Sequence, residues 1–213
     1  MAQKIVEWPG AFKAYETAYK QIMKNPAPMW FFVAVTTIVT VWSMAAQGVT
    51  SVVDKGYDDY ASALILVFII PLINYAFAVI AGKPMTIPEF MQFSLRKLLL
   101  VIVLSLMVVL IVAGSILLLI IPAIWTMAWF AQSMYSLVDK NLSPVQALKD
   151  SKRISEKHKA KVWGLIGVSF LLGIFAGILS VLPIFGQVFT ALVTVLSTVA
   201  ATNLYKWLDL AAK

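Results

Sequence analysis

Long apolar runs separated by short polar segments dominate this chain. A helix needs about 20 mostly apolar residues to cross a hydrocarbon core of about 30 Å, and lipid offers no partners for unpaired backbone groups. Each apolar run comes close to this length. The pattern therefore predicts six membrane-crossing helices, at residues 29–46, 62–81, 98–119, 122–138, 162–182 and 185–205.

Residues 98–138 contain no charged side chain, so the boundary between the third and fourth predicted helices rests on other signals. One straight helix of this length would extend about 60 Å at 1.5 Å per residue, twice the thickness of the hydrocarbon core. Gly114 and Pro122 are the candidates for a break, because glycine loosens a helix and proline removes a backbone donor. We predict a turn at residues 119–122.

Three polar segments place a proline where a short helix is predicted to begin, at Pro9, Pro88 and Pro144. Proline is tolerated there because the first N–H groups of a helix have no internal partner. Thr86 with Glu89, and Ser143 with Gln146, fit the capping box. We predict that these segments lie at the cytoplasmic interface, with the first at about residues 9–24. The predicted fold class is thus all-α, a polytopic bundle with proline-initiated interfacial helices.

Composition and charge refine this picture. The chain is 61% hydrophobic and 13% charged with a mean hydropathy of +0.88, values typical of membrane proteins. With six crossings, all 17 Lys and Arg residues except Lys55 fall on one side of the membrane. The positive-inside rule then places both termini in the cytoplasm. The net charge of +7 is explained by this orientation, so we do not expect nucleic-acid binding.

These boundaries predict a single integral membrane domain over residues 1–213. Residues 1–28 form a cytoplasmic amphipathic segment, and residues 29–205 form the six-helix bundle. Within the bundle, residues 139–161 are a basic cytoplasmic loop that includes a short helix. Residues 206–213 form a cytoplasmic tail.

The basic loop has two interpretations. Its lysines can serve only to orient the chain, which the positive-inside rule alone explains. They can also bind anionic lipid headgroups, since a basic side chain near an anionic surface contributes about 1 kcal/mol. We favour the first interpretation and keep the second open. The candidate anionic-lipid contacts are Lys149, Lys152, Arg153, Lys157, Lys159 and Lys161.

Polar and small residues in the last two predicted helices also have two interpretations. Gly173 and Gly177 in the fifth helix, and Thr190, Thr194 and Ser197 in the sixth, can allow close helix packing. The hydroxyls can instead line a pathway. Coupled ion transport usually needs ionisable groups within the membrane, and the predicted crossings have none. We therefore favour packing.

The sequence gives no set of residues typical of an active site. His158 is the chain's only histidine, and we expect it to be a solvated loop side chain. The chain has no cysteine, and neither a phosphate-binding loop nor a nucleophile elbow occurs. We therefore predict no catalytic, cofactor-binding or metal-binding residue.

Several motifs resemble a group of prokaryotic six-helix membrane families. They are Ser-Pro-Val-Gln-Ala-Leu-Lys-Asp-Ser at 143–151 with Trp163, Ile-Pro-Ala-Ile-Trp at 121–125, and Leu-Pro-Ile-Phe-Gly at 182–186. One such family is the membrane domain attached to some bacterial glycerophosphodiester phosphodiesterases. The resemblance covers about residues 122–205 and implies a helical bundle in a prokaryotic cytoplasmic membrane. In those proteins the chemistry belongs to a separate soluble domain, so no catalytic residue is carried over.

Two functions remain as hypotheses. The first is a non-enzymatic scaffold, assembly factor or accessory subunit that acts through contacts with the lipid bilayer and a membrane-protein partner. The second is a bundle that binds or translocates lipid or an apolar solute. A membrane enzyme ranks below both, because enzymes need positioned acids, bases or metals.

Overall fold

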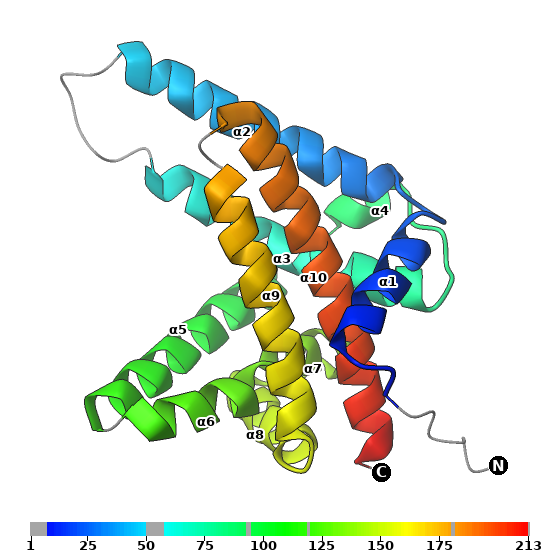
Figure 1. Cartoon of the computed structure of the whole chain (residues 1–213), viewed down its shortest axis with the longest axis vertical. Coiled ribbons are helices and arrows are strands. Elements are labelled where there is room, and N and C mark those ends of the chain that lie inside the picture. The colour runs from blue at the N-terminus through cyan, green and yellow to red at the C-terminus, as the bar shows by residue number, and fades with distance from the viewer. Residues whose placement is uncertain (1–7, 50–57, 93–94, 119, 180–181, 213) are drawn as a thin grey trace. The chain divides into compact units, whose positions relative to one another are not determined.

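In the computed structural model the elements are all helices across the described residues, which are 8–49, 58–92, 95–118, 120–179 and 182–212. Figure 1 shows them in chain order. They are α1 (Ala11–Ile22), α2 (Ala27–Val49), α3 (Asp58–Ile80), α4 (Ile87–Met91), α5 (Leu95–Leu118), α6 (Ile120–Phe130), α7 (Ser133–Lys140), α8 (Pro144–Glu156), α9 (Lys159–Leu179) and α10 (Pro183–Ala211).

The helices group into two compact units. Unit 1 combines Met1–Thr17, Phe93–Val168 and Ala200–Lys213, and unit 2 combines Ala18–Gln92 with Ser169–Val199. Unit 1 thus contains all of α5 to α8, and unit 2 contains all of α2 to α4. The assignment of residues 1–213 to a single membrane domain stays a prediction.

Three helices are long and apolar enough to cross a membrane: Leu95–Ser115 within α5, Lys159–Leu179, which is α9, and Ile184–Ala211 within α10. A fourth is added if α1 and Ala27–Trp42 of α2, which are bent by 99°, form one broken span. The structure therefore has three or four candidate membrane spans among its described residues, where the sequence predicted six.

The predicted fourth crossing, residues 122–138, differs most from expectation. The chain forms two short helices here, α6 and α7, with a turn at residues 131–132. At 1.5 Å per residue they extend about 16 and 12 Å, so neither alone reaches across a core of about 30 Å. The Ser133 hydroxyl donates to the carbonyl of Phe130 at 2.7 Å and supports the turn. The turn predicted at residues 119–122 includes residue 119, which lies outside the described residues.

The predicted helix at residues 9–24 is shorter than expected. It begins at Ala11, because Gly10 has a φ of +94°, which is incompatible with a right-handed helix at that residue. The carbonyl of Gly10 accepts the first helical hydrogen bond, from the N–H of Ala14 at 3.0 Å. Pro9 therefore precedes the helix and does not start it.

Capping boxes are present at the starts of α4 and α8. Thr86 and Ser143 are the N-cap residues, and each accepts a hydrogen bond from the backbone three residues later. The side chains of Glu89 and Gln146 in turn accept hydrogen bonds from the N–H groups of Thr86 and Ser143, at 2.8 and 3.2 Å. These reciprocal bonds satisfy donors that a helix start otherwise leaves unpaired.

Unit 2 has an aromatic core in which Phe90, from the five-residue helix α4, is fully buried. The ring of Phe90 lies 6.2 Å from each of the rings of Phe31, Phe68 and Tyr75, measured between centroids. The Tyr75 hydroxyl donates to the carbonyl of Asn25 at 2.7 Å. This contact connects α3 to the segment between α1 and α2. The aromatic core therefore joins α2, α3 and α4 within unit 2.

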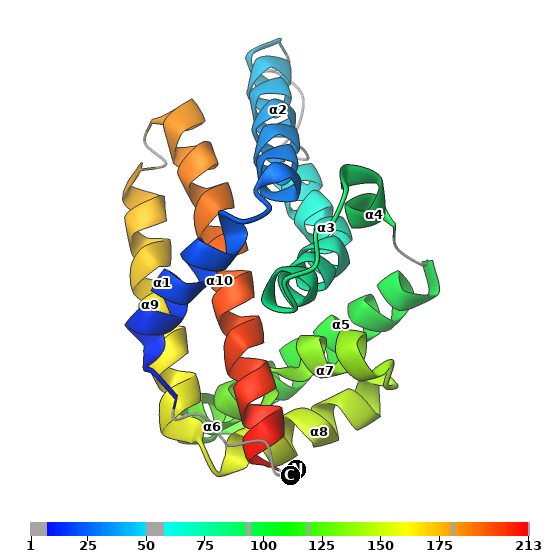
Figure 2. The same cartoon turned by 90° about the vertical axis from the view of Figure 1, so that its right-hand side faces the viewer.

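Unit 1 is built on contacts among α5, α6, α7 and α8. Figure 2 shows α6, α7 and α8 close together in this unit. Their buried side chains include Leu104 of α5, Ala128 of α6, Leu137 of α7 and Ile154 of α8. The Ser151 hydroxyl of α8 donates to the carbonyl of Trp129 of α6 at 2.6 Å.

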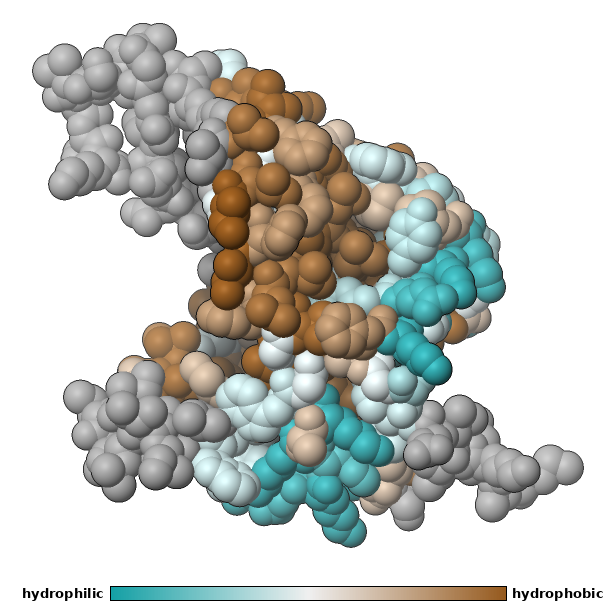
Figure 3. Space-filling view, in the orientation of Figure 1, coloured by the Kyte–Doolittle hydropathy of each residue, from teal (hydrophilic) through white to brown (hydrophobic). Residues whose placement is uncertain are grey.

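Large apolar side chains are exposed along the candidate membrane helices. In unit 2, Figure 3 shows hydrophobic side chains gathered over α9 and α10, and four residues of α9 are each more than half exposed: Phe170, Leu171, Phe175 and Ile178. The middle of α5 in unit 1 also exposes Leu106, Val109 and Leu110. Continuous apolar surface of this kind is typical of contact with lipid.

Candidate functional site

A cluster of charged side chains lies where α7, α8 and the end of α10 meet in unit 1. We call it the ion-pair cluster and define it as Asp139, Lys140, Asp150, Arg153, Lys206 and Asp209. The ammonium group of Lys140 is at its centre, 2.7 Å from the carboxylates of both Asp150 and Asp209. Lys140 belongs to α7, Asp150 to α8 and Asp209 to α10. One side chain therefore connects three helices.

Further polar contacts complete the ion-pair cluster. Arg153 pairs with Asp150 at 2.8 Å, and the Ser136 hydroxyl donates to the same carboxylate at 3.0 Å. Asp139 of α7 accepts hydrogen bonds from two residues of α10, from the Tyr205 hydroxyl at 3.0 Å and from Lys206 at 2.9 Å. Asp150 and Asp209 have side chains only 14% and 13% exposed. Carboxylates this buried need such partners to stay charged.

The ion-pair cluster shifts the pKa values of two of its members, Asp150 and Lys140. Burial tends to raise the pKa of Asp150, but hydrogen bonds from Lys140, Arg153 and Ser136 outweigh it and hold that pKa below its usual range. Burial likewise tends to lower the pKa of Lys140, and the two carboxylates outweigh it and raise that pKa. Both shifts favour the charged forms of Asp150 and Lys140 at neutral pH.

The lowered pKa of Asp150 predicts acid sensitivity. A group with a depressed folded-state pKa stabilises the fold above its unfolded-state pKa, about 3.9 for aspartate, and this contribution is lost as pH falls through the folded-state pKa. We expect Asp150→Asn to be less stable than wild type at pH 7, and the difference to narrow below about pH 4. Denaturant unfolding of the purified protein at pH 7, 5, 4 and 3 measures this.

The exposed carboxylate of Glu156, also on α8, provides the control. Glu156→Gln removes one negative charge outside the ion-pair cluster, so its difference from wild type should stay small across the same pH range. If the free energy of unfolding of Asp150→Asn differs from that of wild type by the same amount at every pH, the charge of Asp150 does not have the assigned role.

The predicted lipid-contact residues have different surroundings. Lys152 lies 4.6 Å from the ring centroid of Trp129, Lys159 lies 4.1 Å from that of Trp125, and Lys161 lies 4.0 Å from that of Trp207. These distances are typical of cation–π contacts. Arg153 belongs to the ion-pair cluster, whereas Lys149 and Lys157 have exposed side chains. Binding of lipid by these residues stays a prediction.

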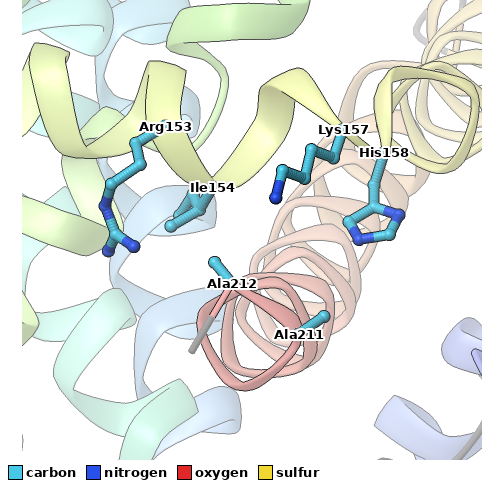
Figure 4. Close-up of a pocket in the computed structure, with 6 residues that line it drawn as sticks. All are labelled: Arg153, Ile154, Lys157, His158, Ala211 and Ala212. Carbon is cyan, nitrogen blue, oxygen red and sulfur yellow. The ribbon is translucent and has the colours of Figure 1, made fainter.

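A small cavity with basic walls lies between the α8–α9 turn and the end of α10. We call it the basic cavity and define it as the space lined by Arg153, Ile154, Lys157, His158, Ala211 and Ala212, with a volume of about 110 Å³. Figure 4 shows Arg153 on one side and Lys157 and His158 on the other, with Ala211 and Ala212 of the end of α10 between them. The basic cavity thus gathers three nitrogen-bearing side chains from one short stretch of chain.

His158 is more enclosed than expected for a solvated loop side chain. Its ring is half-buried and packs edge-on against Trp207, with centroids 4.9 Å apart and the planes at 70°. Burial lowers the pKa of His158, and the charges of Lys161 and Lys157 lower it further. The free imidazole is therefore largely neutral at pH 7 and keeps both a donor and an acceptor nitrogen.

Two of the predicted helix-packing residues, Gly173 and Gly177, have open space where a side chain would begin. A Cβ added at Gly173 or Gly177 would meet no described heavy atom within 4 Å. On α10, the hydroxyl of Thr190 donates to the carbonyl of Gly186 and that of Thr194 to the carbonyl of Thr190, each at 2.8 Å. Ser197 lies further along the same helix. Their role in helix packing stays a prediction.

The structure also brings together residues that sequence reasoning did not group. Lys140 and Asp209 are 69 positions apart, and no local motif connects them. The capping box at Ser143 did locate α8, which carries Asp150 and Arg153. Helical spacing from that start places these two residues one turn apart, and this was the available signal for two of the six residues of the ion-pair cluster.

No family model matches this chain, and no match was found among curated proteins or solved structures. The resemblance to six-helix prokaryotic membrane families therefore stays a prediction.

Proposed function

We propose that this chain is a non-enzymatic integral membrane protein that acts as a scaffold, assembly factor or accessory subunit. The observation that carries the proposal is the ion-pair cluster. Its charges bind one another across α7, α8 and α10 and so form a fixed polar end in unit 1. Long apolar helices α5, α9 and α10 supply the membrane contact. A fixed polar surface joined to membrane helices suits lasting contact with another membrane protein.

The proposal includes six membrane segments with both termini in the cytoplasm of a prokaryotic cell. The distribution of Lys and Arg supports this topology, since only Lys55 falls on the outer side. Helices α2, α3, α5, α9 and α10 lie at five of the predicted crossings, and the pair α6–α7 lies at the remaining one. The interfacial role of α1, α4 and α8 is part of the same proposal.

Cysteine accessibility tests the topology, because the native chain has no cysteine. Single variants Lys83→Cys and Asn141→Cys should resist a membrane-impermeant maleimide in intact cells and react after lysis. Ser51→Cys should react in intact cells. Labelling of Asn141→Cys from outside would contradict the proposed placement of the basic loop.

Retention of a protein partner tests the function. The protein would be extracted from its native membrane in polymer nanodiscs without detergent, and the retained proteins and lipids identified by mass spectrometry. We expect one protein at a constant stoichiometry. Lys149→Glu, at an exposed site on α8, should reduce its retention, whereas Lys83→Glu in unit 2 makes the same charge change elsewhere and serves as the control. Nanodiscs that hold only bulk lipid would contradict the scaffold proposal.

The second candidate function is binding or translocation of lipid or an apolar solute. The basic cavity supports it, because anionic headgroups need positively charged partners. The hydroxyls of α10 support it less. Those of Thr190 and Thr194 donate to carbonyls of their own helix, an arrangement that satisfies them without a solute.

A further inference from the structure

The size of the basic cavity limits what it can bind. A volume of about 110 Å³ is several times the roughly 10–15 Å³ that one water needs, yet well below the roughly 300–1,000 Å³ of sites for drug-sized ligands. The space suits a compact group such as phosphate. Larger parts of a ligand would have to lie outside the cavity.

The charges around the basic cavity favour an anion. Arg153 and Lys157 bring two basic side chains, and His158 offers a ring N–H. The opposing charges are the carboxylates of Asp150 and Asp209, which lie 2.8 and 3.9 Å from Arg153. Lys157 therefore brings the positive charge on the side of the cavity away from these carboxylates, and His158 adds a hydrogen-bond donor there.

A helix begins next to the basic cavity. Helix α9 begins at Lys159, immediately after His158. The first N–H groups of a helix point out of its start and carry partial positive charge, which favours phosphate oxygens nearby. The start of α9 therefore adjoins His158, one of the residues that line the basic cavity.

The location of the basic cavity suits the headgroup layer of a membrane. Both α9 and α10 are candidate membrane spans, and the cavity lies at the start of the first and the end of the second. Trp207, which packs against His158, is a residue type common at membrane interfaces.

We propose that the basic cavity is a binding site for a phosphate group, held by Lys157, His158 and Arg153. An anionic phospholipid headgroup and a free phosphate present the same chemistry to these residues. The inference rests on the second candidate function and supplies its ligand class. Its failure would leave the scaffold proposal standing, because partner retention tests that proposal separately.

Histidine NMR provides a direct test, because His158 is the only histidine of the native chain. Tag-free protein with ¹⁵N-labelled histidine would be studied in maltoside detergent micelles, which contain no phosphate. Inorganic phosphate is added in one series and phosphatidylglycerol in another, with diacylglycerol as the uncharged lipid control. We expect the His158 ring signals to shift with an anionic probe and the pKa of His158 to rise, since a nearby anion favours the imidazolium.

The two series distinguish the source of the phosphate. A response to phosphatidylglycerol at much lower concentration than to inorganic phosphate assigns the site to a lipid headgroup. A response to inorganic phosphate alone assigns it to a soluble ligand. No response to either probe, or an equal response to diacylglycerol, would overturn the proposal.

Matched variants separate a specific site from general surface charge. Lys157→Gln should weaken binding of the active probe about tenfold, because it removes a charge-assisted contact at the cavity. Lys149→Gln removes the same charge elsewhere on the basic segment and should change binding by less than about twofold. Lys157→Arg keeps the positive charge and should retain binding. It therefore shows whether the weaker binding of Lys157→Gln is due to the lost charge. Equal weakening by Lys149→Gln and Lys157→Gln would overturn the proposal.

Discussion

Phe90→Ala is expected to lower the free energy of unfolding by about 3–5 kcal/mol, the usual cost of removing a buried phenyl ring. Phe90 is fully buried, and its ring lies against Phe31, Phe68 and Tyr75. It is the one side chain of α4 that is buried. Its loss would leave a cavity in unit 2 and release α4, because a five-residue helix has little stability of its own.

Two further variants, one at the same position and one on the same helix, make this prediction specific. Phe90→Leu keeps much of the apolar volume and should cost clearly less than Phe90→Ala. Ile87→Ala, on the same helix but 39% exposed, should have a smaller effect again. Thermal unfolding gives the overall loss, and hydrogen exchange should show faster exchange in α3 and α4 for Phe90→Ala. Equal costs for Phe90→Ala and Ile87→Ala would contradict the role of Phe90 as the core residue.

Lys140→Met should produce the second largest loss, about 2–4 kcal/mol. The variant keeps most of the side-chain volume but removes the charge that Asp150 and Asp209 share. Removing one partner of a buried pair is costly because the remaining carboxylates stay desolvated without compensation. Lys140 is itself 28% exposed, which places the expected value toward the lower part of the range for buried pairs. Denaturant unfolding at pH 7 measures the loss.

Two further variants test whether the cost comes from the unpaired carboxylates. Lys149→Met makes the same chemical change at an exposed site on α8 and should alter stability by less than about 0.5 kcal/mol. Combining Lys140→Met with Asp150→Asn and Asp209→Asn removes the stranded charges and should recover part of the loss. If the triple variant is less stable by the full sum of the single losses, the charges do not act as a unit.

The helices followed from the sequence where apolar length and capping residues agreed. The run near 162–182 predicted α9 to within three residues at each end, and the capping boxes at Ser143 and Thr86 gave the starts of α8 and α4. Length and composition suffice for a long apolar helix such as α9, since a helix in lipid must satisfy its own backbone hydrogen bonds.

Features that depend on tertiary contacts could not be predicted from the sequence. Nothing in the apolar run at 122–138 indicated the turn at 131–132, because Gln132 and Ser133 are compatible with a helix until their buried surroundings are known. His158 was expected to be solvated, and its contact with Trp207 depends on packing between residues far apart in the chain. A single sequence shows which residues carry charge, but it does not show which of them meet.

The long separation between Lys140 and Asp209 has a consequence for biogenesis. The ribosome completes α7 and α8 well before it adds the part of α10 that holds Asp209. During that interval Lys140 and Arg153 lack one of their carboxylate partners and depend on Asp150, water or lipid headgroups for compensation. The ion-pair cluster can close only after the turn of α10 that holds Asp209 has been synthesised, so this end of the protein is completed late in synthesis of the chain.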